Sequence, residues 1–302
     1  MKKPVSRTFS FVFVALVYLL ALAAAIAAYR LLGGVQPIVR MFLADAAATL
    51  VVWLAGVAVS NSSVYDPYWS VAPIAIAAFW AMESGPLGVP ALLCLAVVFV
   101  WGTRLTANWA RRWQGLGHQD WRYTMYRRNM PRLWFIINLF GINLMPTVLV
   151  FLGMISVYYA LFSSQQAILV AIPGFLLAVA AILLEHIADR QMDAYQRRPN
   201  PKSPCIAEGL WLVCRHPNYL GEVLFWWGLW AIGMSAGSSL WTVAGPTAIT
   251  ALFVFVSIPM MEKHITSTRP EYEAVIKGVP VLLPSPGKLF GSKDNEKSVG
   301  IQ

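Results

Sequence analysis

The sequence predicts an all-α fold, a polytopic transmembrane bundle of about seven or eight helices. Hydrophobic residues make up 58% of the 302 residues and charged residues only 12%, whereas soluble domains carry about 25% charged residues. Apolar runs of roughly 17–25 residues match the length of a helix that crosses a bilayer. Because these runs are continuous and do not alternate with polar residues, a β-barrel is disfavoured.

Eight apolar segments are expected to cross the membrane. One of them contains Asn138, Asn143 and Pro146. The loop before it is basic and the turn after it is uncharged, so it should cross once, with a kink near Pro146 and both asparagines facing protein or a cavity. Asp45, near the start of another crossing, is expected close to the membrane interface. The eight segments cover 9–29, 41–60, 61–82, 89–108, 133–162, 167–186, 218–234 and 240–260.

The three most basic segments, 110–132, 187–217 and 261–297, fall on one side of this topology. By the positive-inside rule that side is the cytoplasm, and both termini lie there too. The first apolar run is longer than the core of a signal peptide, so we expect it to stay as an anchor. The sequence thus predicts an integral protein, of the bacterial inner membrane, in contact with membrane lipids. Its net charge of +9 resides in loops and does not indicate nucleic-acid binding.

The cysteines and histidines show no metal-binding pattern. The three cysteines form no CxxC pair, and the four histidines form no HExxH or paired spacing. We therefore expect neither a metal site nor a disulfide framework.

The polar chemistry of the chain is concentrated between Glu185 and Glu222. RHPNYLGE at 215–222 has the form of a helix start, with Pro217 in the first turn. Asn218 and Glu222 are four residues apart and share a helix face, and Gly221 leaves room for a flat ring. The pattern suits one wall of a cofactor pocket and equally suits a capped, charged loop at the membrane surface. The candidate cofactor residues here are Glu185, Asp189, Arg190, Arg197, Arg215, His216, Asn218, Gly221 and Glu222.

A second polar segment, NSSVYDPYWS at 61–70, precedes a short apolar run. An ionisable residue at membrane depth is costly, so Asp66 is a candidate functional residue. A buried carboxyl tends to stay protonated, so Asp66, with Tyr65 or Tyr68, could polarise a substrate oxygen in an apolar cavity. The alternative is an interfacial loop with an aromatic belt.

The loop at 110–132 carries six arginines against the single acidic residue Asp120. Such a surface could bind a phosphate-bearing cofactor or anionic lipid head groups. Because the chain has no GxGxxG motif, a dinucleotide site in it would not be a Rossmann fold.

The segments EHIADRQ, GLWLVCRHPNYLGEVLFWWG and RPEYEAVIKGVPVLLPSP resemble the C-terminal half of the steroid 5α-reductase family, and its uncharacterised bacterial relatives most closely. The resemblance covers about 60–302. It implies an NADPH-dependent oxidoreductase acting on an activated C=C bond in an apolar substrate, such as a 3-oxo-Δ4-steroid. It also implies a reductase-like membrane domain with cytoplasmic cofactor loops at 61–290, after additional helices at 1–60 and before a disordered tail at 291–302.

The resemblance also implies roles for individual residues. Asn218 and Glu222 match the family's N-x-x-G-E motif at the nicotinamide end, and Asp189 matches a cofactor-site aspartate. Asp66 matches a membrane glutamate that meets the substrate ketone, and Arg104 matches a family arginine that we assign to cofactor binding. The family tyrosine that helps to polarise the ketone falls on Trp101, which cannot play that role, so Tyr65 or Tyr68 would replace it.

Two other functions remain open. RHPNYLG near a helix start, with a C-terminal Glu and Tyr segment, also resembles S-adenosylmethionine-dependent membrane methyltransferases of the isoprenylcysteine carboxyl or phospholipid type. In that reading Arg215, His216 and Glu262 would contact the cofactor. Glu222 directly after Gly221, and the Asp189 helix before the loop, favour the reductase. A non-catalytic lipid-binding or scaffold protein is the remaining possibility.

Overall fold

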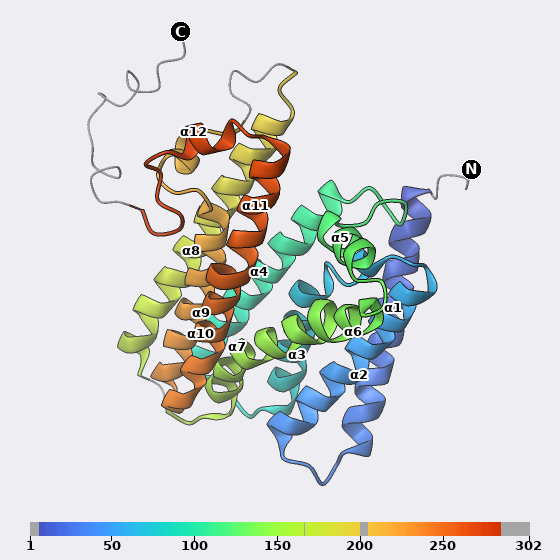
Figure 1. Ribbon diagram of the computed structural model, residues 1–302. Coiled ribbons are helices and arrows are strands. Elements are labelled where there is room, and N and C mark those ends of the chain that lie inside the picture. The colour runs from blue at the N-terminus through green and yellow to red at the C-terminus, as the bar shows by residue number, and fades with distance from the viewer. Residues whose placement is uncertain (1–5, 166, 200–204, 285–302) are drawn as a thin grey trace. The chain divides into compact units, whose positions relative to one another are not determined.

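The computed structural model describes residues 6–165, 167–199 and 205–284 (Figure 1). Helices and the loops that join them make up these ranges, which confirms the all-α prediction. The tail predicted at 291–302 lies outside the described residues. Six helical segments are long and apolar enough to cross a membrane: Arg7–Leu31, Pro37–Ala58, Val89–Arg112, Trp134–Phe162, Ile168–Gln196 and Leu240–Thr268.

Two other expected crossings are also helical. They are α3 (Tyr68–Glu83) and α9 (Pro217–Ser235). The α3 helix has only 16 residues, and α9 opens with the polar Asn218 and Glu222. Neither therefore matches the length and mean hydropathy of the other six, and the expectation of eight crossings stays a prediction.

The chain divides into two compact units. The first holds residues up to 172 together with 229–245, and the second holds 173–228 together with residues from 246 onward. The helices of the first unit include α1 (Arg7–Leu31), α2 (Pro37–Ala58), α3, α4 (Val89–Arg112), α5 (Trp121–Asn129), α6 (Trp134–Ile136) and α7 (Met145–Phe162). Most of α8 (Ile168–Gln196), the start of α9, and α11 (Ile258–Thr268) and α12 (Tyr272–Ile276) belong to the second; α10 (Ala244–Leu252) begins at the boundary.

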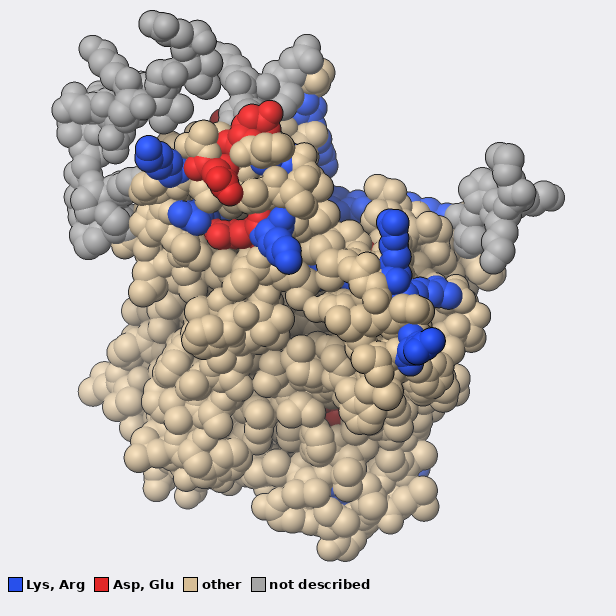
Figure 2. All heavy atoms as spheres, in the orientation of Figure 1, with Lys and Arg blue, Asp and Glu red and all other residues tan. Residues whose placement is uncertain are grey.

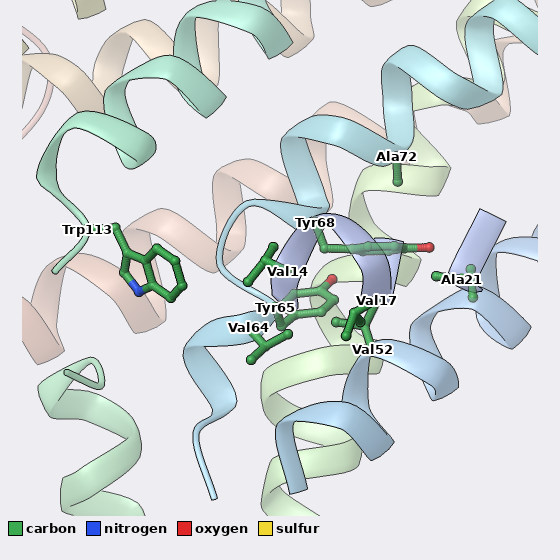
Figure 3. Close-up of a cluster of buried hydrophobic side chains, with 10 residues drawn as sticks. Val14, Val17, Ala21, Val52, Val64, Tyr65, Tyr68, Ala72 and Trp113 are labelled. Carbon is green, nitrogen blue, oxygen red and sulfur yellow. The ribbon is translucent and has the colours of Figure 1, made fainter. Parts of the chain in front are cut away.

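The core of the first unit fixes the segment that joins α2 to α3. A 3₁₀ turn, Ser62–Val64, begins this segment, and the Asn61 side chain caps it by accepting a hydrogen bond from the Ser63 N–H at 2.9 Å. The rings of Tyr65 and Tyr68 are packed among aliphatic side chains of α1 and α2 (Figure 3). The cluster comprises Val14, Val17, Ala21, Ala48, Val52, Val64, Tyr65, Tyr68, Ala72 and Trp113.

The expected 133–162 crossing is continuous helix over Trp134–Phe162, and Ile137–Leu144 within it is a π-helix. The wider turn brings Asn138 and Asn143, five residues apart, together: the Asn143 Nδ2 donates to the Asn138 carbonyl oxygen at 2.7 Å. Both side chains are buried, which confirms that they face protein. The π-helix ends just before Pro146, where the sequence predicts the kink. π-Helices are rare in proteins, and those that occur are often found at functional sites.

In the second unit, α8 and α9 are held close together by glycines. A Cβ atom on Gly228 would lie 2.7 Å from the Ala178 backbone nitrogen, and one on Gly221 would lie 2.8 Å from the Ala181 carbonyl oxygen. Small residues of this kind let helix backbones approach each other in membranes. The turn of α9 that carries Asn218 and Glu222 is thereby fixed against α8.

We predict that Gly228→Leu destabilises the protein by roughly 1–3 kcal/mol, because the new side chain must displace the α8 backbone. Gly85→Leu is the matched control, since a Cβ atom on Gly85 meets nothing within 4 Å. Thermal unfolding of the detergent-purified variants measures the difference. Equal melting temperatures for the two variants would contradict the packing described for α8 and α9.

Candidate functional site

Asp66 lies in the segment between α2 and α3, outside the six candidate spans. It is partly exposed, whereas the residues on either side of it, Tyr65 and Pro67, are buried. The Tyr123 hydroxyl on α5 donates to the Asp66 Oδ1 at 2.8 Å. The Ser63 side chain also hydrogen-bonds the carboxyl group. The structure therefore presents Asp66 as a largely enclosed carboxyl that is oriented by two hydroxyl groups.

Burial raises the pKa of Asp66 to about 7. The hydrogen bond from Tyr123 acts in the opposite direction, and the nearby Asp120 adds to the increase. Burial of the ring raises the pKa of Tyr123 well above its ordinary value, and the charge of Asp66 and the hydrogen bond to it add to this increase. Below pH 7 both groups thus carry protons. The Tyr123 hydrogen is donated to Asp66, so the hydrogen of the Asp66 carboxyl is the one that can be donated to an oxygen that develops negative charge.

Tyr65 and Tyr68, the predicted partners of Asp66, have hydroxyl groups engaged in a different network. The Tyr68 hydroxyl donates to the Asp45 Oδ1 at 2.6 Å. The Tyr65 hydroxyl lies 2.8 Å from the Thr147 Oγ1, which lies 2.9 Å from the Thr49 Oγ1. The structure thus adds Tyr123 as the bonded partner of Asp66, and a catalytic role for Tyr65 or Tyr68 stays a prediction.

Sequence reasoning missed Tyr123 and the hydrogen bond between Asp45 and Tyr68. Tyr123 lies in the arginine-rich 110–132 segment, where charge dominates the pattern, and nothing local records its contact with Asp66. The expectation that Asp45 lies near the membrane interface stays a prediction. The structure shows that Asp45 is buried within the protein, only 6% exposed, and accepts a hydrogen bond from Tyr68. An acidic residue within an apolar run was the signal that could have identified it.

Two further predicted positions lie on α4, in the first unit. Trp101 is fully buried, and its ring lies 6.0 Å from that of Trp69, centroid to centroid. Arg104 is partly buried, one turn further along. Arg104 thus belongs to the first unit, whereas the other predicted cofactor residues belong to the second.

The second unit brings together the acidic residues predicted on α8 and α9. Glu185 and Asp189 are buried and four residues apart on α8. A Cβ atom on Gly221 would lie 2.8 Å from the Glu185 Cβ, so Glu185 adjoins the turn that carries Glu222. Glu222 is buried, and its Oε1 accepts a hydrogen bond from the Trp226 Nε1 at 2.9 Å. The side of Gly221 that lacks a side chain thus packs against α8. The glycine therefore has a structural role in helix packing, in addition to its predicted role of leaving room for a cofactor ring.

Arg215 and His216, just before α9, meet Glu262 of α11. The His216 Nε2 lies 3.1 Å from the Glu262 Oε1, and the Arg215 Nη1 lies 3.2 Å from the same oxygen. The Arg215 Nε donates to the Val279 carbonyl oxygen at 2.8 Å. Burial lowers the pKa of His216, although Glu262 opposes this, so the imidazole is neutral at pH 7. This cluster joins the start of α9 to α11 and to the segment after α12.

Exposed arginines lie near the end of α8. Arg190 and Arg197 are exposed, and Arg198 forms a bidentate ion pair with Glu208 at 2.6 and 2.9 Å. A nicotinamide dinucleotide carries phosphates, ribose hydroxyls and a carboxamide. Exposed guanidinium groups suit the phosphates, and buried carboxylates beside an asparagine suit the hydroxyls and the carboxamide. The donor set of this unit therefore fits such a cofactor.

Among the described residues, no group of three or more histidine, cysteine, aspartate or glutamate side chains could hold a metal ion.

The chain is similar to an uncharacterized protein, C594.04c, of Schizosaccharomyces pombe, with 25% identity over 67% of each chain. No solved structure is significantly similar to this chain. A family described as "Protein of unknown function (DUF1295)" matches residues 52–278, a range that contains both polar regions described above. The chain therefore belongs to the DUF1295 family.

Proposed function

We propose that this membrane protein is an NADPH-dependent reductase of an activated C=C bond in an apolar substrate, such as a 3-oxo-Δ4-steroid. The observation that carries the proposal is the hydrogen bond between Tyr123 and Asp66, a carboxyl group whose pKa is raised to about 7. A proton-bearing carboxyl next to a phenol, in a protein built of apolar helices, is suited to bind and polarise a carbonyl oxygen.

On the substrate side, the protonated Asp66 carboxyl would donate a hydrogen bond to the carbonyl oxygen of an enone, while the Tyr123 hydroxyl holds the Asp66 Oδ1. Reduction at the β-carbon places negative charge on this oxygen, and a carboxyl donor that Tyr123 already orients would stabilise that charge. Low dielectric around the pair strengthens both hydrogen bonds. The apolar surroundings favour a substrate that partitions into the membrane.

On the cofactor side, Asn218 and Glu222 would hold the carboxamide, while Arg190 and Arg197 would pair with phosphates. Bound NADPH would supply a hydride to the β-carbon. Glu185 and Asp189 would bind ribose hydroxyls. Both are buried on α8, and Glu185 adjoins Gly221. The exposed arginines are the reason to prefer NADPH over NADH, since a 2′-phosphate needs a cationic partner.

The contact of Arg215, His216 and Glu262 favours the methyltransferase as a second candidate, because these are the residues its resemblance implies. In the structure, however, Arg215 also binds the carbonyl oxygen of Val279. That contact gives the cluster a structural use and weakens this alternative. A methyltransferase also has no need for the carboxyl and phenol pair at Asp66.

Cofactor binding to the detergent-purified protein tests the proposal. NADPH, NADH and S-adenosylmethionine are titrated side by side and followed by intrinsic tryptophan fluorescence. We expect NADPH to bind more tightly than NADH, and S-adenosylmethionine not to bind. Binding of S-adenosylmethionine alone would establish the methyltransferase, and binding of none of the three would favour the scaffold reading.

The turnover of an enone should fall as the pH rises through about 7. The raised pKa means that Asp66 is protonated, and able to donate, below this value and becomes an ionised acceptor above it. The pH profile of kcat measures this loss. Asp66→Asn keeps two donor hydrogens at every pH, so the descending limb near pH 7 should disappear in that variant. A limb unchanged in Asp66→Asn would assign the titration to another group.

A further inference from the structure

The arginine segment, residues 110–132, is bound along its inner side to the segment that carries Asp66. The Asn61 Nδ2 donates to the carbonyl oxygens of Leu116, at 2.8 Å, and His118, at 3.0 Å. The Gln119 Oε1 accepts from the Ser62 N–H at 3.0 Å. The two residues of each hydrogen bond are 55–57 positions apart in sequence, so these bonds join two separate parts of the chain.

The same pairing continues toward Asp66. The Asp120 N–H donates to the Ser63 Oγ at 3.0 Å, and the Tyr123 hydroxyl donates to Asp66 at 2.8 Å. Ser63 also hydrogen-bonds the Asp66 carboxyl. Both hydroxyl groups that orient Asp66 therefore depend on the position of the arginine segment.

The outer side of the arginine segment is basic and exposed. Arg127, Arg128 and Arg132 are all exposed. Asp120, the only acidic residue of the segment, is bound by Arg122 at 2.9 Å. Basic side chains gather over this region, next to a broad uncharged surface (Figure 2). The outer side thus presents positive charge that the acidic residue of the segment does not neutralise.

Exposed apolar side chains follow directly in the chain. Met130 is 45% exposed and Leu133 is 52% exposed, and they flank Arg132. Beyond them begins the candidate span Trp134–Phe162. Arginines interleaved with apolar side chains at the end of a span are suited to the interface, where guanidinium groups meet head groups and apolar side chains reach the acyl boundary.

We infer that the arginine segment binds anionic phospholipid head groups of the membrane that the protein crosses, through Arg127, Arg128 and Arg132. Lipid binding holds the segment in place and, through the Ser63 and Tyr123 contacts, holds Asp66 in its described orientation. The binding part of this inference does not depend on the proposed reductase activity. It gives the protein a lipid site, with a consequence for the residue that carries the proposed chemistry.

The test uses the full chain in a neutral detergent, titrated with phosphatidylglycerol and, separately, with phosphatidylcholine. We expect phosphatidylglycerol to bind more tightly and its affinity to fall as salt rises. Arg128→Gln should weaken phosphatidylglycerol binding roughly fivefold, because each arginine near an anionic surface contributes about this factor. Arg30→Gln removes one exposed arginine at the far end of α1 and should leave the affinity unchanged.

The link to Asp66 is read by amide hydrogen exchange over residues 116–128. Phosphatidylglycerol should slow this exchange in the natural protein and leave it unchanged in the triple variant Arg127→Gln, Arg128→Gln and Arg132→Gln. Equal affinities for the two lipids, or equal losses in Arg128→Gln and Arg30→Gln, would overturn the lipid site. Tight, arginine-dependent binding without slower exchange would overturn the link to Asp66. Thermal unfolding of each variant checks that it is folded.

Discussion

Replacing Asp66 with alanine should lower the turnover of a 3-oxo-Δ4-steroid by roughly 100- to 1000-fold while leaving NADPH affinity unchanged. The substitution removes the donor that would stabilise the carbonyl oxygen, and the residue belongs to a different compact unit from Asn218 and Glu222. The measurement is NADPH consumption at saturating substrate, together with NADPH affinity from fluorescence titration. Unchanged turnover would remove Asp66 from the mechanism.

Two tyrosines of α5 supply a matched control for this result. Tyr123→Phe deletes the hydroxyl that binds Asp66 and should also lower turnover. Tyr126→Phe deletes a hydroxyl about one helical turn further along α5 and should leave turnover unchanged. A loss of the same size in both variants would indicate damage to α5 and not the loss of a donor.

Replacing Glu222 with glutamine should weaken NADPH binding by roughly 10- to 100-fold, the effect expected when a buried, charged hydrogen bond is lost. Glutamine retains an oxygen that can accept the hydrogen bond from Trp226, so the start of α9 should stay folded. The substitution therefore tests the negative charge of Glu222 while it keeps the packing of the side chain. Titration of the purified variant with NADPH, with thermal unfolding as a check on folding, measures the loss.

Glu273→Gln is the control, because Glu273 is an exposed acidic residue on α12. It should bind NADPH as the natural protein does. Normal affinity in Glu222→Gln would contradict the assignment of the α8 and α9 residues to the cofactor. In that case the buried acidic residues of this unit would have a structural role only.

The fold class could be predicted from the sequence because membrane helices satisfy their own backbone hydrogen bonds, so length and hydropathy alone identify them. The same reasoning correctly placed Asn138 and Asn143 facing protein, since polar amides are too costly to expose to lipid. Whether α3 and α9 cross the membrane was harder to predict. The α3 helix is short and α9 begins with polar residues, so each has features of both membrane-spanning and surface helices.

The partners within the candidate site could not be predicted in the same way. Tyr123 and Asp66 are 57 residues apart, and their hydrogen bond depends on how α5 folds back over the α2–α3 segment. Hydrophobic periodicity records which side of a helix is buried but not which distant side chain it meets. Gly221 shows the same limit, because a glycine that admits a ligand and one that admits a neighbouring helix have the same local pattern.

The central claim is that a hydride passes from NADPH to the β-carbon of an apolar enone in this protein. The most direct test incubates the purified protein with NADPH carrying deuterium at the transferable C4 position and with a 3-oxo-Δ4-steroid, and analyses the steroid by mass spectrometry. We predict a saturated ketone that carries one deuterium, at the former β-carbon. A steroid recovered unreduced and unlabelled, from protein that is folded and binds NADPH, would contradict the account.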